Sequence, residues 1–222
     1  LLLYNQHPKQ QVGIFFLWKS GRKAIRLIID ARPTSQMFRC PPGLPQRGLR
    51  RIELELPEEV DADSRKGMTM LQETHVYLGL AEVKDCFHRL KAPLWLTKYF
   101  ALPPVPARVV GLGDCLVEGR RAGHDDAVYP CCASLCMGFN WSLFFAQKAN
   151  EEHVRVSPKF ASKGLMTDRG APAIFTPGGP SRTYHYVYVY NIGIMATNKK
   201  EVEEPLNLMV DYFEDRGLTL HG

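Results

Sequence analysis

The strict alternation of residues 184–190 constrains the fold more than any other part of this 222-residue chain. One parity of this segment is occupied by tyrosine alone: Tyr184, Tyr186, Tyr188 and Tyr190. Because successive side chains of a strand point to opposite faces, the alternation predicts a β-strand with one aromatic face. Asn191 and Gly193 follow with turn chemistry, and apolar residues from Ile192 to Met195 begin a return strand. The segment therefore predicts an antiparallel hairpin.

Further apolar patterns predict the remaining strands and the helices that cover them. The expected strands are 12–18, 24–30 and 75–83, and the expected helices are 140–154 and 199–215. The first two strands flank a basic turn, which indicates a second hairpin. The acidic segment 52–70 predicts a short helix. The order of hairpin, strand, helix, hairpin and helix predicts an α+β fold with helices behind an antiparallel sheet.

The composition is that of an ordinary folded domain, with 45% hydrophobic and 23% charged residues. It excludes disordered, collagenous and coiled-coil chains. The uncharged run 127–147 contains Pro130, Gly138 and Asn140, so we interpret it as a buried loop entering a core helix rather than a membrane span. No signal-peptide pattern is present, and an intracellular location in an unspecified compartment is expected.

The six cysteines lack the regular spacing of a disulfide framework, and reduced thiols are expected. One alternative remains open. Cys131, Cys132, Cys136 and His124 could form a zinc site, although their spacing is neither that of a finger nor that of a ribbon. That arrangement would make the chain an unrelated Cys/His metal protein.

Positive charge is concentrated in the N-terminal quarter of the chain. Residues 1–52 hold ten Lys and Arg side chains and one acid, Asp30, which gives +9. Since the whole chain carries +5, residues 53–222 carry −4. This asymmetry favours a polyanionic partner for the N-terminal part, and a solvated surface without a partner is the alternative.

Four segments, taken together and in this order, resemble the reverse transcriptases (RNA-directed DNA polymerases) of retroelements. They are the hairpin Lys19–Arg32, Leu80–Leu90 (motif A), Ser134–Ser142 (motif B) and Tyr188–Asn191 (motif C). Gly217 and Leu218 are similar to the start of motif D. The resemblance covers about residues 12–220.

The resemblance implies a right-hand polymerase fold and its activity. Residues 1–74 would form the fingers region, with the hairpin at 12–30 and an irregular crossing. Residues 75–222 would form the palm, with a fingers-like insertion at about 93–130, and the thumb would be absent. The implied reaction is addition of deoxynucleotides to a primer, with an RNA or DNA template-primer and deoxynucleoside triphosphate as partners. The implied cofactor is a pair of Mg²⁺ ions that assist an in-line displacement.

The resemblance also assigns site residues. The catalytic positions are Glu82, Tyr190 and Asn191. The nucleotide-binding positions are Lys19, Arg26, Phe87, Met137 and Gly138. The nucleic-acid-binding positions are Phe139, Arg22 and Lys23. Asp85 is a second candidate metal ligand beside Glu82.

Three of these positions depart from the aspartates of the family. Glu82 keeps its charge, but the extra methylene moves its carboxylate by up to about 1.5 Å, and a misplacement near 1 Å can cost about 100-fold in rate. Tyr190 and Asn191 are uncharged, so the acidic centre falls from −3 to −1. We therefore expect polymerisation to be impaired or absent and Mg²⁺ binding to be weak. A non-catalytic nucleic-acid-binding module with the same fold is the alternative.

Overall fold

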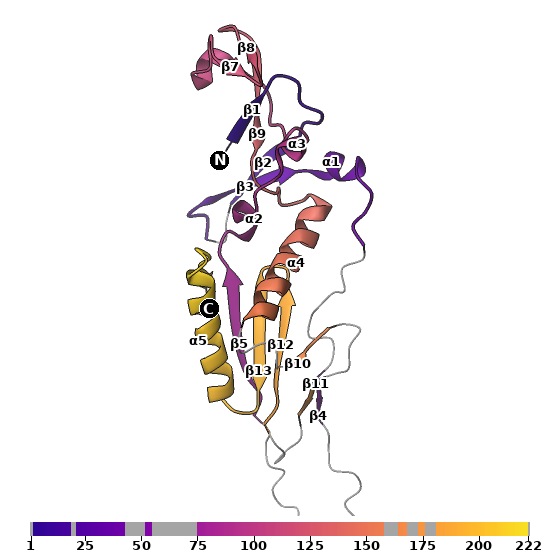
Figure 1. Ribbon diagram of the computed structural model, residues 1–222, viewed down its shortest axis with the longest axis vertical. Coiled ribbons are helices and arrows are strands. Elements are labelled where there is room, and N and C mark those ends of the chain that lie inside the picture. Colours follow the sequence, from indigo (N-terminus) through magenta and orange to yellow (C-terminus); the bar gives the residue numbers. More distant parts are fainter. Residues whose placement is uncertain are drawn as a thin grey trace, which may run out of the picture. The chain divides into compact units, whose positions relative to one another are not determined.

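The computed structural model describes residues 2–18, 21–42, 52–54, 75–157, 164–167, 173–175 and 181–221 (Figure 1). The chain forms two compact units. Unit 1 consists of Leu1–Pro42 and Asp85–Ala146, and unit 2 of Gly43–Lys84 and Gln147–Gly222. The expected division at residue 74 lies outside the described residues, so it stays a prediction.

Unit 1 is built from small sheets and short helices. One sheet has the strand order β1 (Leu2–Asn5), β9 (Ala127–Cys132) and β6 (Val105–Pro106). A second sheet pairs β2 (Gly13–Trp18) with β3 (Ile25–Asp30), and a third pairs β7 (Leu116–Val117) with β8 (Arg120–Arg121). The helices of unit 1 are α1 (Arg32–Gln36), α2 (Cys86–Arg89), α3 (Leu94–Thr97), the 3₁₀ helix η2 (Ala107–Val110) and the first residues of α4 (Asn140–Val156). The antiparallel β2–β3 pair confirms the hairpin expected at 12–30.

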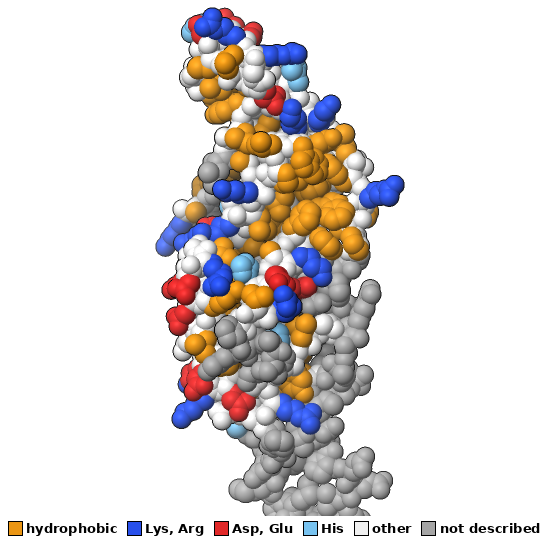
Figure 2. Space-filling view, in the orientation of Figure 1, with side chains coloured by type: hydrophobic (Ala, Val, Ile, Leu, Met, Phe, Trp, Pro, Cys, Tyr) orange, Lys and Arg blue, Asp and Glu red, His pale blue; other side chains and the backbone are white. Residues whose placement is uncertain are grey.

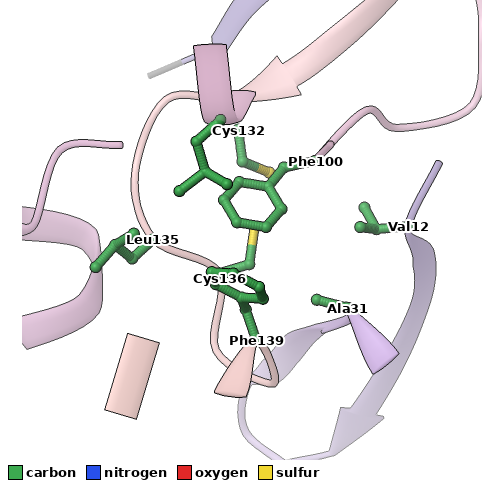
Figure 3. Packing of buried hydrophobic residues seen from close by; sticks show 8 residues of the cluster. Val12, Ala31, Phe100, Cys132, Leu135, Cys136 and Phe139 are labelled. Atoms are coloured by element: carbon green, nitrogen blue, oxygen red, sulfur yellow. The ribbon is translucent and has the colours of Figure 1, made fainter. Parts of the chain in front are cut away.

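Distant segments of unit 1 share one hydrophobic core (Figure 3). Its buried members are Val12, Ala31, Leu96, Phe100, Cys132, Leu135, Cys136 and Phe139. The rings of Phe100 and Phe139 meet edge to face with centroids 5.2 Å apart, a favoured arrangement of aromatic pairs. The core therefore joins the hairpin to the loop that precedes α4.

Part of the surface of unit 1 is apolar. Figure 2 shows hydrophobic side chains gathered over the region where β2, α1 and α3 lie in Figure 1. Phe16 and Trp18 of β2 are 67% and 61% exposed, and Leu94 of α3 is 74% exposed. Exposed apolar surface on this scale is typical of an interaction site.

Unit 2 contains a five-stranded sheet. Its strand order is β10 (Gly164–Leu165), β12 (Thr183–Tyr188), β13 (Asn191–Ala196), β5 (Tyr77–Val83) and β14 (Leu220–His221). All neighbours are antiparallel except β10, which is parallel to β12. The hairpin predicted from the tyrosine alternation is confirmed by β12 and β13.

Unit 2 also contains a second, smaller sheet. Strand β4 (Ile52–Leu54) pairs in parallel with β11 (Ala173–Phe175), at the beginning of the segment 52–70 that was expected to contain a short helix. Apolar residues alternate with an acid in Ile52-Glu53-Leu54, which suits a strand. Residues 55–70 lie outside the described residues, so the short helix expected in this segment stays a prediction.

Helix α5 (Lys200–Glu214) covers one face of the large sheet. Its buried residues Val202, Met209 and Phe213 follow helical spacing, as predicted. A Cβ placed on Gly79 of β5 would lie 2.6 Å from a methyl of Val202, so the glycine lets helix and strand approach closely.

Apart from the short strands β4, β10 and β11, the elements of unit 2 follow one another in the order βαββαβ: β5, α4, β12, β13, α5 and β14. The expected mixed fold of helices and mainly antiparallel sheets is confirmed. Along β5, Gly79, Ala81 and Val83 are buried, whereas Leu78, Leu80 and Glu82 are exposed. The face of β5 opposite the one that α5 covers is therefore accessible. Farther along the same face of the sheet, Tyr186 of β12 and Met195 of β13 are buried in a cluster with Met166, Ala173 and Phe175.

No helix within the described ranges has the length and apolar character of a membrane span. The uncharged run 127–147 begins as strand β9, continues as a loop and ends in the first turns of α4. The interpretation of this run as a loop that enters a helix therefore applies to the part after residue 132, and the part before it is a strand.

Candidate functional site

The ends of β5 and β13 bring two catalytic positions of the resemblance side by side. Glu82 of β5 is paired in register with Asn191, the first residue of β13. The next amide of β5, that of Val83, donates a hydrogen bond of 2.8 Å to the carbonyl oxygen of Tyr190. Directly paired residues of antiparallel strands share a face, so Glu82 and Asn191 lie on the same face of the sheet, where Glu82 is exposed and Asn191 is half-buried.

Strand β14 places another polar residue at the same level of the sheet. His221 is paired in register with Glu82 on the side away from Asn191. The three neighbouring strands therefore carry an amide, a carboxylate and an imidazole at one level. The sequence did not indicate this position of His221, because nothing in a single strand shows which strands will be its neighbours.

A tight turn connects β12 to β13. Tyr188 and Asn191 are paired, which leaves Val189 and Tyr190 as a two-residue loop. Val189 has a φ of +55° and is 7% exposed. A left-handed conformation is an outlier for a β-branched residue, and such outliers cluster at functional sites.

Two buried amides of α4 bind the backbone of this turn. The Val189 amide donates to Oε1 of Gln147 at 2.6 Å, and Nδ2 of Asn150 donates to the Val189 carbonyl at 2.6 Å. Nε2 of Gln147 also donates to the Val187 carbonyl at 2.9 Å. Sequence reasoning missed both residues. The sequence carries no signal that separates these two amides from amides of a helix that face solvent.

The loop before α4 lies against the end of the hairpin in unit 1. Gly138 has a φ of +103°, and a Cβ on it would lie 3.1 Å from the Ile29 carbonyl oxygen of β3. Glycine is suited to both the conformation and the close approach. Met137, next to it, is 51% exposed. The segment resembling motif B and the strand that carries Arg26 are therefore neighbours.

Two aromatic positions of the resemblance are buried in unit 1. Phe87 of α2 is 4% exposed, and Phe139 is 2% exposed in the hydrophobic core. Contact with a nucleotide or a nucleic acid needs an accessible ring edge, so both roles stay predictions. Asp85 is exposed, has a φ of +53° and precedes α2.

The hairpin of unit 1 presents cations to solvent. Arg22, Lys23 and Arg26 are exposed, whereas Lys19 lies outside the described residues. Asp30 and Arg32 form an ion pair with two hydrogen bonds, of 2.8 and 2.6 Å. These bonds hold the pKa of the Asp30 carboxyl at about 2. The charge of Arg32 is therefore offset by Asp30. In the described part of the hairpin, Arg22, Lys23 and Arg26 are exposed cations that could contact a phosphate.

The side chains at the paired strand ends do not fit a two-magnesium centre. Mg²⁺ requires hard oxygen ligands in octahedral geometry. The paired strand ends supply one carboxylate, that of Glu82, opposite the amide of Asn191, and Tyr190 before it carries no carboxylate. Among the residues that the structure describes, no group of three or more His, Cys, Asp or Glu side chains could hold a metal ion.

The cysteines give no support to the zinc alternative. All six lie within the described residues and none forms a disulfide, and burial is the main cause that raises the pKa of Cys131 to about 11. His124 pairs with Asp114 at 3.0 Å instead. Within the described residues, these cysteines and His124 do not form a metal-binding group.

Comparison of the sequence with models of known protein families gave no match, and comparison with curated proteins gave none either.

Proposed function

We propose that this chain is the fingers-and-palm region of a retroelement reverse transcriptase whose polymerisation activity is lost or severely reduced. The observation that carries the proposal is the register of β5 and β13. It places Glu82 opposite Asn191, more than one hundred positions away in the sequence. The resemblance requires these two segments to be neighbours, since they correspond to motifs A and C.

The arrangement around this pair also supports the proposal. The βαββαβ order and the exposed face of β5 suit a palm, in which helices cover one face and the other faces the substrates. In unit 1, the cation-bearing hairpin lies against the loop of Met137 and Gly138, as expected for a pocket that receives a triphosphate.

The loss of activity follows from charge. Two divalent cations about 3.5–4 Å apart need several carboxylates to offset their repulsion, and this centre supplies one. The phenol of Tyr190 adds bulk where the family has a carboxylate. The chain's own residues would then bind and orient a template-primer without activating a nucleotide.

Primer extension on an RNA template tests the proposal. The natural chain is compared with a triple variant, Glu82→Asp, Tyr190→Asp and Asn191→Asp, each with a thumb domain appended. We expect no product from the natural chain and Mg²⁺-dependent product from the triple variant. A control variant with Tyr77→Asp and Leu78→Asp adds two carboxylates to β5 away from the turn, and it should stay inactive. Robust extension by the natural chain would contradict the loss of activity.

A non-catalytic nucleic-acid-binding module is the second candidate, and the exposed Arg22, Lys23 and Arg26 favour it. Its binding would weaken steeply with salt, because bound counterions are released from the phosphates, and would not depend on Mg²⁺. Salt-dependent binding by the triple variant without any extension would favour this candidate over a decayed polymerase.

A further inference from the structure

The turn between β12 and β13 is held in a conformation that its own residues do not favour. A two-residue hairpin loop with a positive φ at its first position is the usual place for glycine. This chain has Val189 there, with a φ of +55°. Val189 therefore needs support from the surrounding structure to stay in this conformation.

Helix α4 supplies that support through Gln147 and Asn150. These side chains are 2% and 3% exposed, and together they bind both the amide and the carbonyl of Val189. Glu151 accepts a second hydrogen bond from Nε2 of Gln147, at 2.7 Å. Because a carboxylate only accepts, Glu151 fixes which end of the Gln147 side chain is the donor. Oε1 is thereby left to accept from Val189.

Ordinary packing would not require these amides. Helix α5 packs against the same sheet with the apolar residues Val202, Met209 and Phe213. Burying an amide is unfavourable unless its hydrogen bonds are made. In α4 these bonds are directed to the backbone of β12 and its turn, at Val187 and Val189.

We propose that Gln147 and Asn150 are positioning residues that hold the turn 188–191 against the end of β5, independently of the side chains at 190 and 191. The hydrogen bond from the Val83 amide to the Tyr190 carbonyl is the contact that they maintain. The chain thus keeps the backbone arrangement of a divalent-cation site after its carboxylates have been replaced, and we call this arrangement of the turn 188–191 against the end of β5 the frame. The frame rests on the proposed function, whereas the positioning role stands on the hydrogen bonds alone.

Amide hydrogen exchange at Val83 tests the positioning role. Asn150→Ala should speed exchange of this amide about tenfold, the effect of losing one buried hydrogen bond. In a Val189→Gly background the same change should alter exchange by less than twofold, because glycine adopts a positive φ without support. Glu152→Ala, at an exposed position of the same helix where the side chain pairs with Arg155, is the matched control and should change nothing. Equal acceleration in both backgrounds would overturn the positioning role.

Binding of Mn²⁺ alone, followed by electron paramagnetic resonance, tests the frame. A variant with Tyr190→Asp and Asn191→Asp should bind Mn²⁺, and addition of Asn150→Ala should weaken that binding at least tenfold. Binding that does not depend on Asn150 overturns the positioning role. If the exchange result holds and the restored variant binds no Mn²⁺, the positioning role stands, but the frame and the proposed function fail.

Discussion

At the scale of single residues, Gly193 leaves room for the aromatic ring of Tyr186 on the neighbouring strand. It is paired in register with Tyr186 of β12, and a Cβ on it would overlap the Tyr186 ring. The tyrosine ring therefore lies over the glycine, an arrangement that shields a strand glycine from solvent. Tyr186 also packs in a hydrophobic cluster with Met166, Ala173, Phe175 and Met195, and it is buried while Tyr188 is 48% exposed.

Substitution Gly193→Ala should lower the free energy of unfolding by about 1–3 kcal/mol, the usual range for overpacking. In a Tyr186→Ala background the same change should cost less than about 1 kcal/mol, because the space of the ring is open. Urea denaturation of the four chains of this double-mutant cycle measures both values. Costs that are equal with and without the ring would show that the overlap is relieved by other movements.

The ion pair of Asp30 and Arg32 predicts an unusual titration. Its hydrogen bonds lower the pKa of Asp30 from 3.8 to about 2, so the folded state holds the carboxylate more strongly than the unfolded state does. The stabilisation is fully present above pH 3.8 and is lost as the pH falls through about 2. Carboxyl carbon shifts in a nuclear magnetic resonance titration should give a midpoint near 2, and Arg32→Gln should raise it. A midpoint that does not respond to Arg32→Gln would exclude this guanidinium as the cause.

At the scale of elements, the contact between α4 and α5 contains a histidine that resists protonation. The centroid of the His153 ring lies 5.2 Å from the ring centroid of Phe213 and 6.3 Å from that of Tyr212. Burial, followed by the charge of Arg216, lowers the pKa of His153. Arg216 itself stacks on the Tyr212 ring at 3.6 Å, which keeps its charge near the histidine.

The unfolded chain therefore binds a proton at His153 more readily than the folded chain does. By linkage, stability should fall as the pH drops through the ordinary histidine value of about 6.5. Urea denaturation at pH 7.5 and 5.5 should show this loss, and His153→Gln should reduce it. A loss of the same size in His153→Gln would assign the pH dependence to other groups.

Much of the secondary structure could be predicted, because local periodicity determines it. The alternation of residues 184–190 predicted β12, and the helical spacing of Val202, Met209 and Phe213 predicted α5. The parallel pairing of β4 with β11 could not be predicted, since it depends on contacts between distant segments. Periodicity alone also does not distinguish an aromatic residue of the core from an accessible one. Phe139, which the resemblance assigned to nucleic-acid binding, is buried.

The candidate site shows the same division between local and tertiary information. The order of the four segments predicted which strands would meet, and the register of Glu82 with Asn191 agrees with it. The role of Gln147 could not be read from the sequence, because an amide in a helix can equally face solvent. Its hydrogen bonds to Val187 and Val189 exist only once α4 lies against β12.

At the scale of the whole molecule, charge separates the two ends of the chain. The first 52 residues carry +9 and the remaining residues −4. Such a distribution attracts a polyanion to the N-terminal part and repels it from the rest. If the exposed Arg22 and Lys23 contact phosphates, they set the salt dependence of binding rather than its sequence preference.

The double variant Arg22→Gln and Lys23→Gln should therefore reduce the salt dependence of binding to single-stranded RNA. Each phosphate contact contributes about 0.7 to the slope of log K against log salt concentration for a single strand, so the slope should become shallower by about 1.4. Arg120→Gln with Arg121→Gln removes the same charge from β8, where both arginines are exposed. Fluorescence anisotropy over a range of salt concentrations compares the variants. Equal changes in the two double variants would mean that RNA senses net charge alone and that the hairpin makes no specific phosphate contacts.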